Sequence, residues 1–292
     1  MNRRAFLGGS IGAAAFAAQA SASRLPIRKA VEFSMLPSSA SVADRFKIAR
    51  EAGFEEVECG TTPDAAAAEE LLAASKVTGL RIHSVMNMAH WSYPMSSADP
   101  SVVAKSVEGM ETSLRNAKLW GSDSVLLVPA VIKAGDSYQD AWTRSQKEIR
   151  KLVKLAAELR VVIGIEEVWN HFLLSPLEFA RYVDEFNSPW VKAYFDVGNI
   201  VLFSFPQDWI KILGARICKL HFKDFKFRPD RSAGTIVAEF VNLKDGDIDW
   251  KAIHAAIRAV GYKGTATVEL KGGDAAYLKD VNERFESILS GV

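Results

Sequence analysis

The chain of 292 residues contains only two cysteines, Cys59 and Cys218. This scarcity argues against a cysteine-rich zinc site and against a fold held together by disulfides. The two thiols fall in the second and the seventh of the eight strands predicted below, and these strands are not neighbours in a closed barrel. We therefore do not expect a disulfide between them.

The chain also lacks an excess of charge of one sign. Its 36 Lys and Arg residues nearly balance its 35 Asp and Glu residues, for a formal net charge of +1. This balance suggests neither a nucleic-acid partner nor an anionic membrane surface. No linker-like or low-complexity stretch divides the chain. No G-x-G-x-x-G follows the first predicted strand, which argues against an open dinucleotide-binding sheet.

The apolar stretch at the N-terminus is short and rich in Ala and Gly. It follows the pair Arg3-Arg4 and ends in A-x-A sites at Ala20 or Ala22. This pattern predicts a twin-arginine export signal over residues 1–22 and a periplasmic protein, rather than a segment stably inserted in the membrane. Removal of the signal takes away both arginines and changes the formal charge to −1.

Residues 23–292 are long enough for a single TIM-barrel domain. Apolar, β-branched runs without polar alternation recur between amphipathic helical segments, which is typical of a parallel sheet covered by helices. Eight such units predict an α/β fold, the closed (β/α)8 barrel, with an open doubly wound sheet as the alternative. The predicted strands cover residues 29–34, 55–59, 80–85, 123–128, 161–166, 191–196, 216–222 and 264–269.

Four side chains with oxygen or nitrogen ligand atoms lie where predicted strands end, namely Glu166, Asp196, His221 and Glu269. The carboxyl ends of parallel barrel strands meet at one face, so these residues are expected to converge there. Two Glu, one Asp and one His form an oxygen-rich set that predicts one divalent metal ion. Mn²⁺ fits best, and Mg²⁺, Co²⁺ or Zn²⁺ are tolerated.

The segments around these residues read IEEVWN, YFDVGN, RICKLHFKDF, GDIDW and GYKGTATVEL. In these segments the chain resembles the xylose isomerase-like TIM-barrel superfamily. Within it, the chain is similar to the sugar phosphate isomerase/epimerase group, which includes tagatose 3-epimerase, L-ribulose-5-phosphate 3-epimerase and hydroxypyruvate isomerase. The resemblance covers nearly all of residues 23–292 and is strongest from Glu166 to Glu269.

The resemblance implies that the four residues bind the metal and that Glu166 and Glu269 are also the catalytic acid/base pair, on opposite faces of a keto sugar. Glu167 is the alternative to Glu166 as the ligand. At the position of Asn199 the tagatose epimerases carry a substrate-contacting histidine, so this chain has the D-V-G-N form of the ribulose-phosphate epimerases.

Other side chains near the predicted strand ends are candidates for substrate binding, together with Asn199, or for structural roles in loops. They are His83, His90, Trp91, Trp169, Asn170, Lys223 and Asp224. The segment 223–231 contains Lys223, Lys226, Arg228 and Arg231, and it could bind a phosphate or could be a solvated basic loop.

These features predict a metal-dependent isomerase or epimerase that removes a proton beside the carbonyl of a keto sugar or related hydroxy-ketone, through an enediolate. The alternatives are a metal-dependent lyase that eliminates from a 3-keto-glycoside, and a non-catalytic secreted sugar-binding barrel. The expected partner is a small sugar, and a homo-oligomer is compatible with the sequence. Apurinic endonucleases share the fold, but five histidines and a near-neutral charge do not suit their trinuclear zinc site and DNA-binding face.

Overall fold

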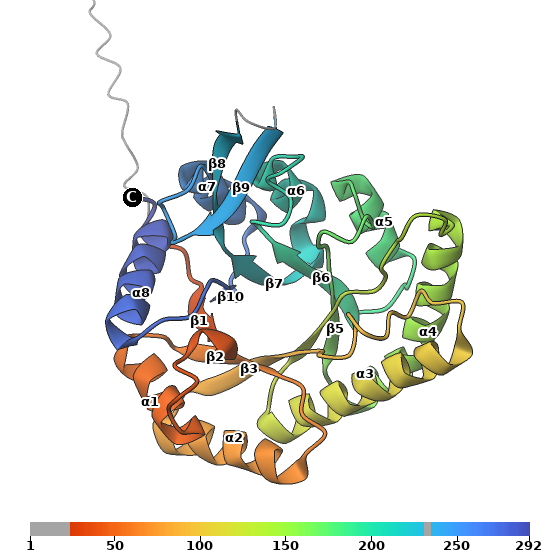
Figure 1. The fold of residues 1–292 in the computed structure, drawn as a ribbon, viewed down its shortest axis with the longest axis horizontal. Coiled ribbons are helices and arrows are strands. Elements are labelled where there is room, and N and C mark those ends of the chain that lie inside the picture. The colour runs from red at the N-terminus through yellow and green to blue at the C-terminus, as the bar shows by residue number, and fades with distance from the viewer. Residues whose placement is uncertain (1–23, 231–234) are drawn as a thin grey trace, which may run out of the picture.

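A computed structural model describes residues 24–230 and 235–292 of the chain. Eight parallel strands form a closed barrel in the spatial order β1-β10-β7-β6-β5-β4-β3-β2 (Figure 1). The strands are β1 (Arg28–Glu32), β2 (Glu56–Gly60), β3 (Arg81–Met86), β4 (Ser124–Leu127), β5 (Val162–Glu166), β6 (Val191–Asp196), β7 (Ile217–Phe222) and β10 (Thr265–Val268). The predicted fold class is therefore confirmed, and each predicted strand has a counterpart displaced by no more than two residues at either end.

In the described part of the chain, eight α-helices surround the barrel (Figure 1). They are α1 (Val42–Glu51), α2 (Ala65–Thr78), α3 (Pro100–Trp120), α4 (Tyr138–Leu159), α5 (Pro176–Asp184), α6 (Pro206–Leu213), α7 (Trp250–Val260) and α8 (Ala275–Ser290). Local sequence sets their starts: the side chain of Ser175 accepts a hydrogen bond from the Glu178 amide, and Pro176 occupies the first turn of α5. No helix in the described ranges is long and apolar enough to cross a bilayer. The predicted export signal, residues 1–22, lies outside the described residues and stays a prediction.

Most barrel strands alternate between apolar residues that face the helices and polar residues that face the lumen, contrary to the continuous apolar runs inferred from sequence; Leu126 of β4, which packs with Tyr194, is an apolar exception. Phe195 of β6 stacks on Trp209 of α6. The preceding residue, Tyr194, faces the other way and donates a hydrogen bond of 2.5 Å to Glu58 of β2. Strands β2 and β6 are not neighbours, so this bond crosses the lumen. A polar lumen therefore lies beneath the carboxyl-end rim of the barrel.

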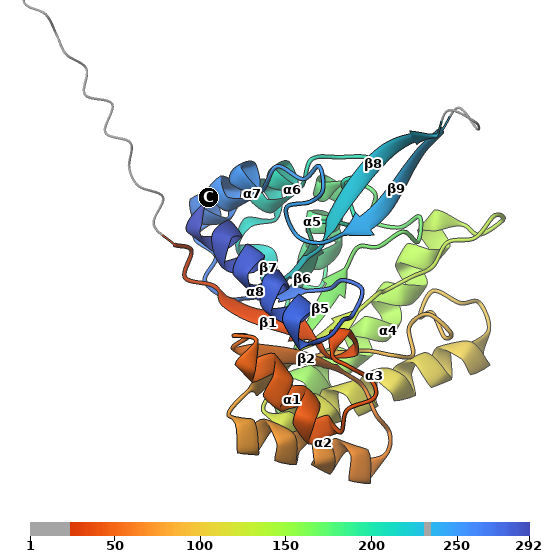
Figure 2. The same ribbon diagram turned by 60° about the vertical axis from the view of Figure 1, so that its left-hand side comes forward.

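An antiparallel hairpin of β8 (Asp224–Asp230) and β9 (Thr235–Val241) follows β7 and projects from the barrel (Figure 2). The sequence predicted a loop over residues 223–231, and this prediction was wrong for the part that forms β8. The run KDFKFRPD has the polar and apolar alternation of a two-sided ribbon, which differs from the continuous apolar pattern of a buried strand. Cys59 and Cys218 are both free thiols.

Candidate metal centre

The four predicted ligands come from four adjacent strands of the barrel. Glu166 ends β5, Asp196 ends β6, His221 lies one residue before the end of β7, and Glu269 directly follows β10. One ligand atom from each residue can be chosen so that all four lie within 4.8 Å of one another. Strand order places the two glutamates at the outer sides of this group, with Asp196 and His221 between them.

The Nδ1 atom of His221 lies at the centre of the group. It is 3.1 Å from Oε1 of Glu166, 3.0 Å from Oε2 of Glu269 and 3.8 Å from Oδ2 of Asp196. Two ligand atoms that face each other across a Mg²⁺-sized ion lie roughly 4 Å apart. A small contraction of the group would therefore let all four side chains coordinate one ion.

The charges of the group also favour a cation. Burial raises the pKa of Glu166 to about 7 and raises that of Asp196. At His221, burial opposes protonation, but Glu58 together with Glu166 and Glu269 outweighs it and raises the imidazole pKa well above its usual value. The carboxylates thus create a negative potential in a buried space, which a divalent ion would neutralise. The residues present fit a metal ion.

Lys223 reaches the group from the strand end beyond His221. Its Nζ lies 2.7 Å from Oδ2 of Asp196 and 2.8 Å from Oε2 of Glu269. Burial opposes a charged amine, but these two carboxylates outweigh it and raise the pKa of Lys223, so it is a cation beside the ligands. Gly198 makes room for it, because a Cβ there would overlap the Lys223 side chain.

Backbone amides fix the orientation of Asp196. Its Oδ1 accepts hydrogen bonds from the amides of Gly198 (2.7 Å) and Asn199 (3.1 Å), which leaves Oδ2 toward the group. Glu167 lies outside the ligand group, where its Oε1 accepts a hydrogen bond of 2.9 Å from the Asp196 amide. The structure thus brings Glu166, and not Glu167, into the group of ligands.

Glu58 is a residue of the site that the sequence reasoning missed. Its Oε2 lies 2.9 Å from Nε2 of His221 and also accepts the hydrogen bond from Tyr194, and both Glu58 and His221 have no solvent exposure. A carboxylate on Nε2 keeps the proton there and leaves Nδ1 free to bind a metal. The signal in the sequence was Glu56-Val57-Glu58, two acidic residues at alternate positions of a buried strand.

Replacing Glu58 with glutamine is expected to weaken metal binding by roughly 10-fold to 100-fold, because a neutral amide makes the His221 imidazole a poorer ligand. Titration calorimetry of chelator-treated protein with Mn²⁺ would measure this. The matched control is Glu56→Gln, on the same strand but paired with Arg81 and Thr265 instead of His221. Equal affinities for wild type and Glu58→Gln would contradict the role.

Three of the predicted substrate-binding residues follow or belong to β3. His83 was expected at the rim, but β3 continues three residues beyond it, so it lies in the lumen with Nε2 2.9 Å from Oγ1 of Thr267 and with no exposure. His90 is buried, and its Nδ1 accepts a hydrogen bond from the Val128 amide. Trp91 is 56% exposed and makes an edge contact with His90.

Four other candidates hold loops in place. Nε1 of Trp169 donates to the carbonyl of Asn199 (2.7 Å), and Nδ2 of Asn199 donates to the carbonyl of Glu167 (2.8 Å). Asn170 donates to the carbonyl of Ala130. Asp224 accepts bonds from Nε1 of Trp250 and the Lys244 amide, both outside the ligand group. Among the described residues of the predicted substrate-binding set, Lys223 contacts the ligand group through its side chain, whereas Asn199 contacts it through its backbone amide.

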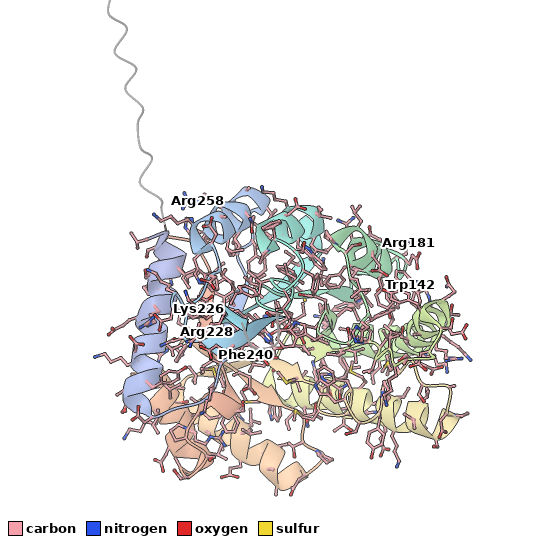
Figure 3. The ribbon with its side chains drawn as sticks, turned by 45° about the horizontal axis from the view of Figure 1, so that its top comes forward. Trp142, Arg181, Lys226, Arg228, Phe240 and Arg258 are labelled. Atoms are coloured by element: carbon pink, nitrogen blue, oxygen red, sulfur yellow. The ribbon has the colours of Figure 1, made fainter. Side chains whose placement is uncertain are left out.

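The basic segment has its described charges paired. Lys226 lies 2.8 Å from Oδ1 of Asp247, and Arg228 forms an ion pair with Glu239 across the hairpin. Figure 3 shows Lys226 and Arg228 together on the hairpin. Arg231 lies outside the described residues. The sequence allowed two interpretations of this segment, a phosphate-binding site or a solvated basic segment. These pairings favour the solvated basic segment.

Residues 46–287 match the model of the xylose isomerase-like TIM barrel family, and the chain belongs to that family. Among curated proteins, the L-ribulose-5-phosphate 3-epimerase of Escherichia coli O1:K1 is 26% identical over 249 residues, which cover 80% of this chain and 84% of the relative.

Solved structures share the fold. The 3-keto-D-glucoside 4-epimerase of Escherichia coli superposes with a TM-score of 0.73 at 16% identity, covering 88% of this chain and 98% of that one. A xylose isomerase-like TIM barrel protein from Mycobacterium smegmatis in complex with magnesium gives a TM-score of 0.70 at 16% identity, covering 91% and 97%.

Proposed function

We propose that this protein is a divalent-metal-dependent epimerase or isomerase of a keto sugar or related hydroxy-ketone. The observation that carries the proposal is the placement of Glu166 and Glu269 on opposite sides of a buried Asp196–His221 pair. Two carboxylates in this arrangement can remove a proton from one face of a substrate carbon and return one to the other. The epimerase named among its relatives supports the same reaction class.

The four ligands would hold the ion, with Mn²⁺ or Mg²⁺ suited to three carboxylates and one imidazole. The magnesium complex of the Mycobacterium smegmatis protein supports a hard divalent ion in this fold. When bound, such an ion polarises the substrate carbonyl and makes the neighbouring C–H more acidic.

The chain's own residues perform the proton transfers. Glu166 or Glu269 accepts the proton from the carbon beside the carbonyl, and the other carboxyl delivers a proton to the opposite face. Lys223 lowers the pKa of Glu269, against the effect of burial, and so keeps this carboxylate ionised and ready to accept a proton. The ammonium also contributes positive charge where the enediolate oxygens develop negative charge.

The test is proton exchange in D₂O. Purified protein loaded with Mn²⁺ is incubated with free ketoses, phosphorylated ketoses and keto-glycosides, and NMR follows deuterium at the carbon beside the carbonyl. We expect exchange in at least one class, with a product epimer or isomer and an intact skeleton. Release of an aglycone would instead indicate the lyase, and no exchange with any substrate would contradict the proposal.

A further inference from the structure

Solvent reaches the ligand group mainly on the side of Glu269. The side chain of Glu269 is 32% exposed, whereas those of Asp196 and His221 have no exposure and that of Glu166 has 7%. A substrate that binds at this group therefore keeps the rest of its structure on the Glu269 side.

A cavity of about 230 Å³ begins one residue beyond Glu269. Its walls come from the end of β9, from the loop that follows β10 and from the first turn of α8, including Phe240, Leu270, Lys271 and Tyr277. The volume corresponds to roughly eight water molecules, which is enough for one six-membered ring. The cavity therefore offers space for a substituent next to the reacting carbon.

Phe240 connects this cavity to the ligand group. Its ring lies 5.6 Å from Nζ of Lys223, which in turn contacts Glu269. The ring also stacks on Trp169 at 5.8 Å and contacts Phe225 at 4.2 Å. Phe240 is 50% exposed and Trp169 is 48% exposed, so the two rings present apolar area to solvent close to the ligands. Figure 3 labels Phe240 on the hairpin beside the paired Lys226 and Arg228.

Some exposed apolar side chains lie in segments that follow the carboxyl ends of the strands. Of the large hydrophobic residues exposed in the described ranges, several follow β3, β5 or β6 or lie on β9: Met88, Trp91, Trp169, Leu202, Phe203 and Phe240. Trp169 and Phe240 form a contiguous exposed apolar surface, and such a surface beside a polar centre marks a ligand or interaction site. A free or phosphorylated monosaccharide has little apolar surface to cover it.

We propose that the cavity beside Glu269 is a subsite for an apolar group carried by the keto sugar, so that the substrate is a glycoside with an aromatic or similarly flat aglycone. This inference rests on the proposed function and specifies its substrate class. In a glycoside the anomeric carbon is locked as an acetal, so the carbonyl must lie on another ring carbon. The ring ketone binds at the ligand group, and the aglycone packs against Phe240 and Leu270.

The probes are phenyl and methyl 3-keto-β-D-glucopyranoside, which share the keto sugar and differ in the aglycone. For the Mn²⁺-loaded protein we expect the phenyl glycoside to have a Kd at least about tenfold lower by calorimetry, and a kcat/KM for deuterium exchange at least about tenfold higher. Phe240→Ala should reduce both ratios to about one, and Phe240→Tyr should retain them. Leu119→Ala, an exposed apolar residue at the far end of α3, should leave them unchanged.

Equal values for the two probes in the wild-type protein would overturn the subsite, as would a phenyl preference that survives Phe240→Ala. A preference for phosphorylated ketoses over both glycosides would also overturn it and would point to Lys271 as an anion contact. If Phe240→Ala dissociates a dimer in sedimentation without changing the ratios, the apolar surface is a subunit interface and the subsite is wrong. A phenyl preference in binding without any exchange would retain the subsite and overturn the proposed function.

Discussion

Glu166→Gln and Glu269→Gln are each expected to lower turnover by at least about 100-fold while metal and substrate still bind. The reason is that an amide oxygen can remain a metal ligand but cannot accept a proton. Each variant retains one carboxylate, so each could still exchange the proton on its intact side with solvent deuterium without completing the inversion. Steady-state rates and single-face deuterium exchange, at metal content matched to wild type, would measure both effects.

Glu167→Gln provides the matched control for these variants. Glu167 is adjacent in sequence and equally buried in the strand end, but it accepts a hydrogen bond from the Asp196 amide, and a glutamine oxygen can accept the same bond. We expect its turnover to remain within about tenfold of wild type. Near-normal turnover in both Glu166→Gln and Glu269→Gln would mean that the base lies elsewhere, and Lys223 would be the next residue to replace.

The barrel could be predicted from sequence because each strand is marked by a short β-branched run and each helix by its own apolar period. Both signals are local, and eight repeats of them leave few closed topologies. The positions of the four predicted ligands could be inferred for the same reason, because each lies within one residue of the point where a strand ends. Asp196 and Glu166 were placed correctly by counting along strands, without any knowledge of which strands are neighbours.

Contacts across the lumen could not be predicted in this way. Glu58 meets His221 from β2, on a strand that is not a neighbour of β7, and the pairing depends on the register and stagger of the closed barrel. His83 was expected at the rim although the predicted strand, residues 80–85, already extended past it; in the structure β3 ends at Met86, and His83 lies in the lumen beside Thr267. Phe240 belongs to a hairpin outside the barrel repeat, so the pattern of strand-helix units carries no signal for it.

Asp196→Asn is expected to remove most of the bound metal, because it converts one of three carboxylate ligands into a neutral amide. The amide oxygen can still accept the hydrogen bonds from the Gly198 and Asn199 amides, so the loop should keep its shape. His221→Ala should remove the ion as well, but it also deprives the buried Glu58 of a hydrogen-bond partner and should cost roughly 1–3 kcal/mol of stability. Asp196→Asn is therefore the cleaner of the two variants.

The measurement is metal content by mass spectrometry after loading with Mn²⁺ and gel filtration, with about one ion per chain expected for wild type and little for Asp196→Asn. Chelation should abolish wild-type turnover, and added Mn²⁺ should restore it, because the strands of the closed barrel hold the four residues together. The matched control is Asp224→Asn, a buried aspartate that binds Trp250 and no ligand. Full occupancy in Asp196→Asn and His221→Ala would place the ion elsewhere, whereas loss in Asp224→Asn as well would indicate disturbed folding and not a lost ligand.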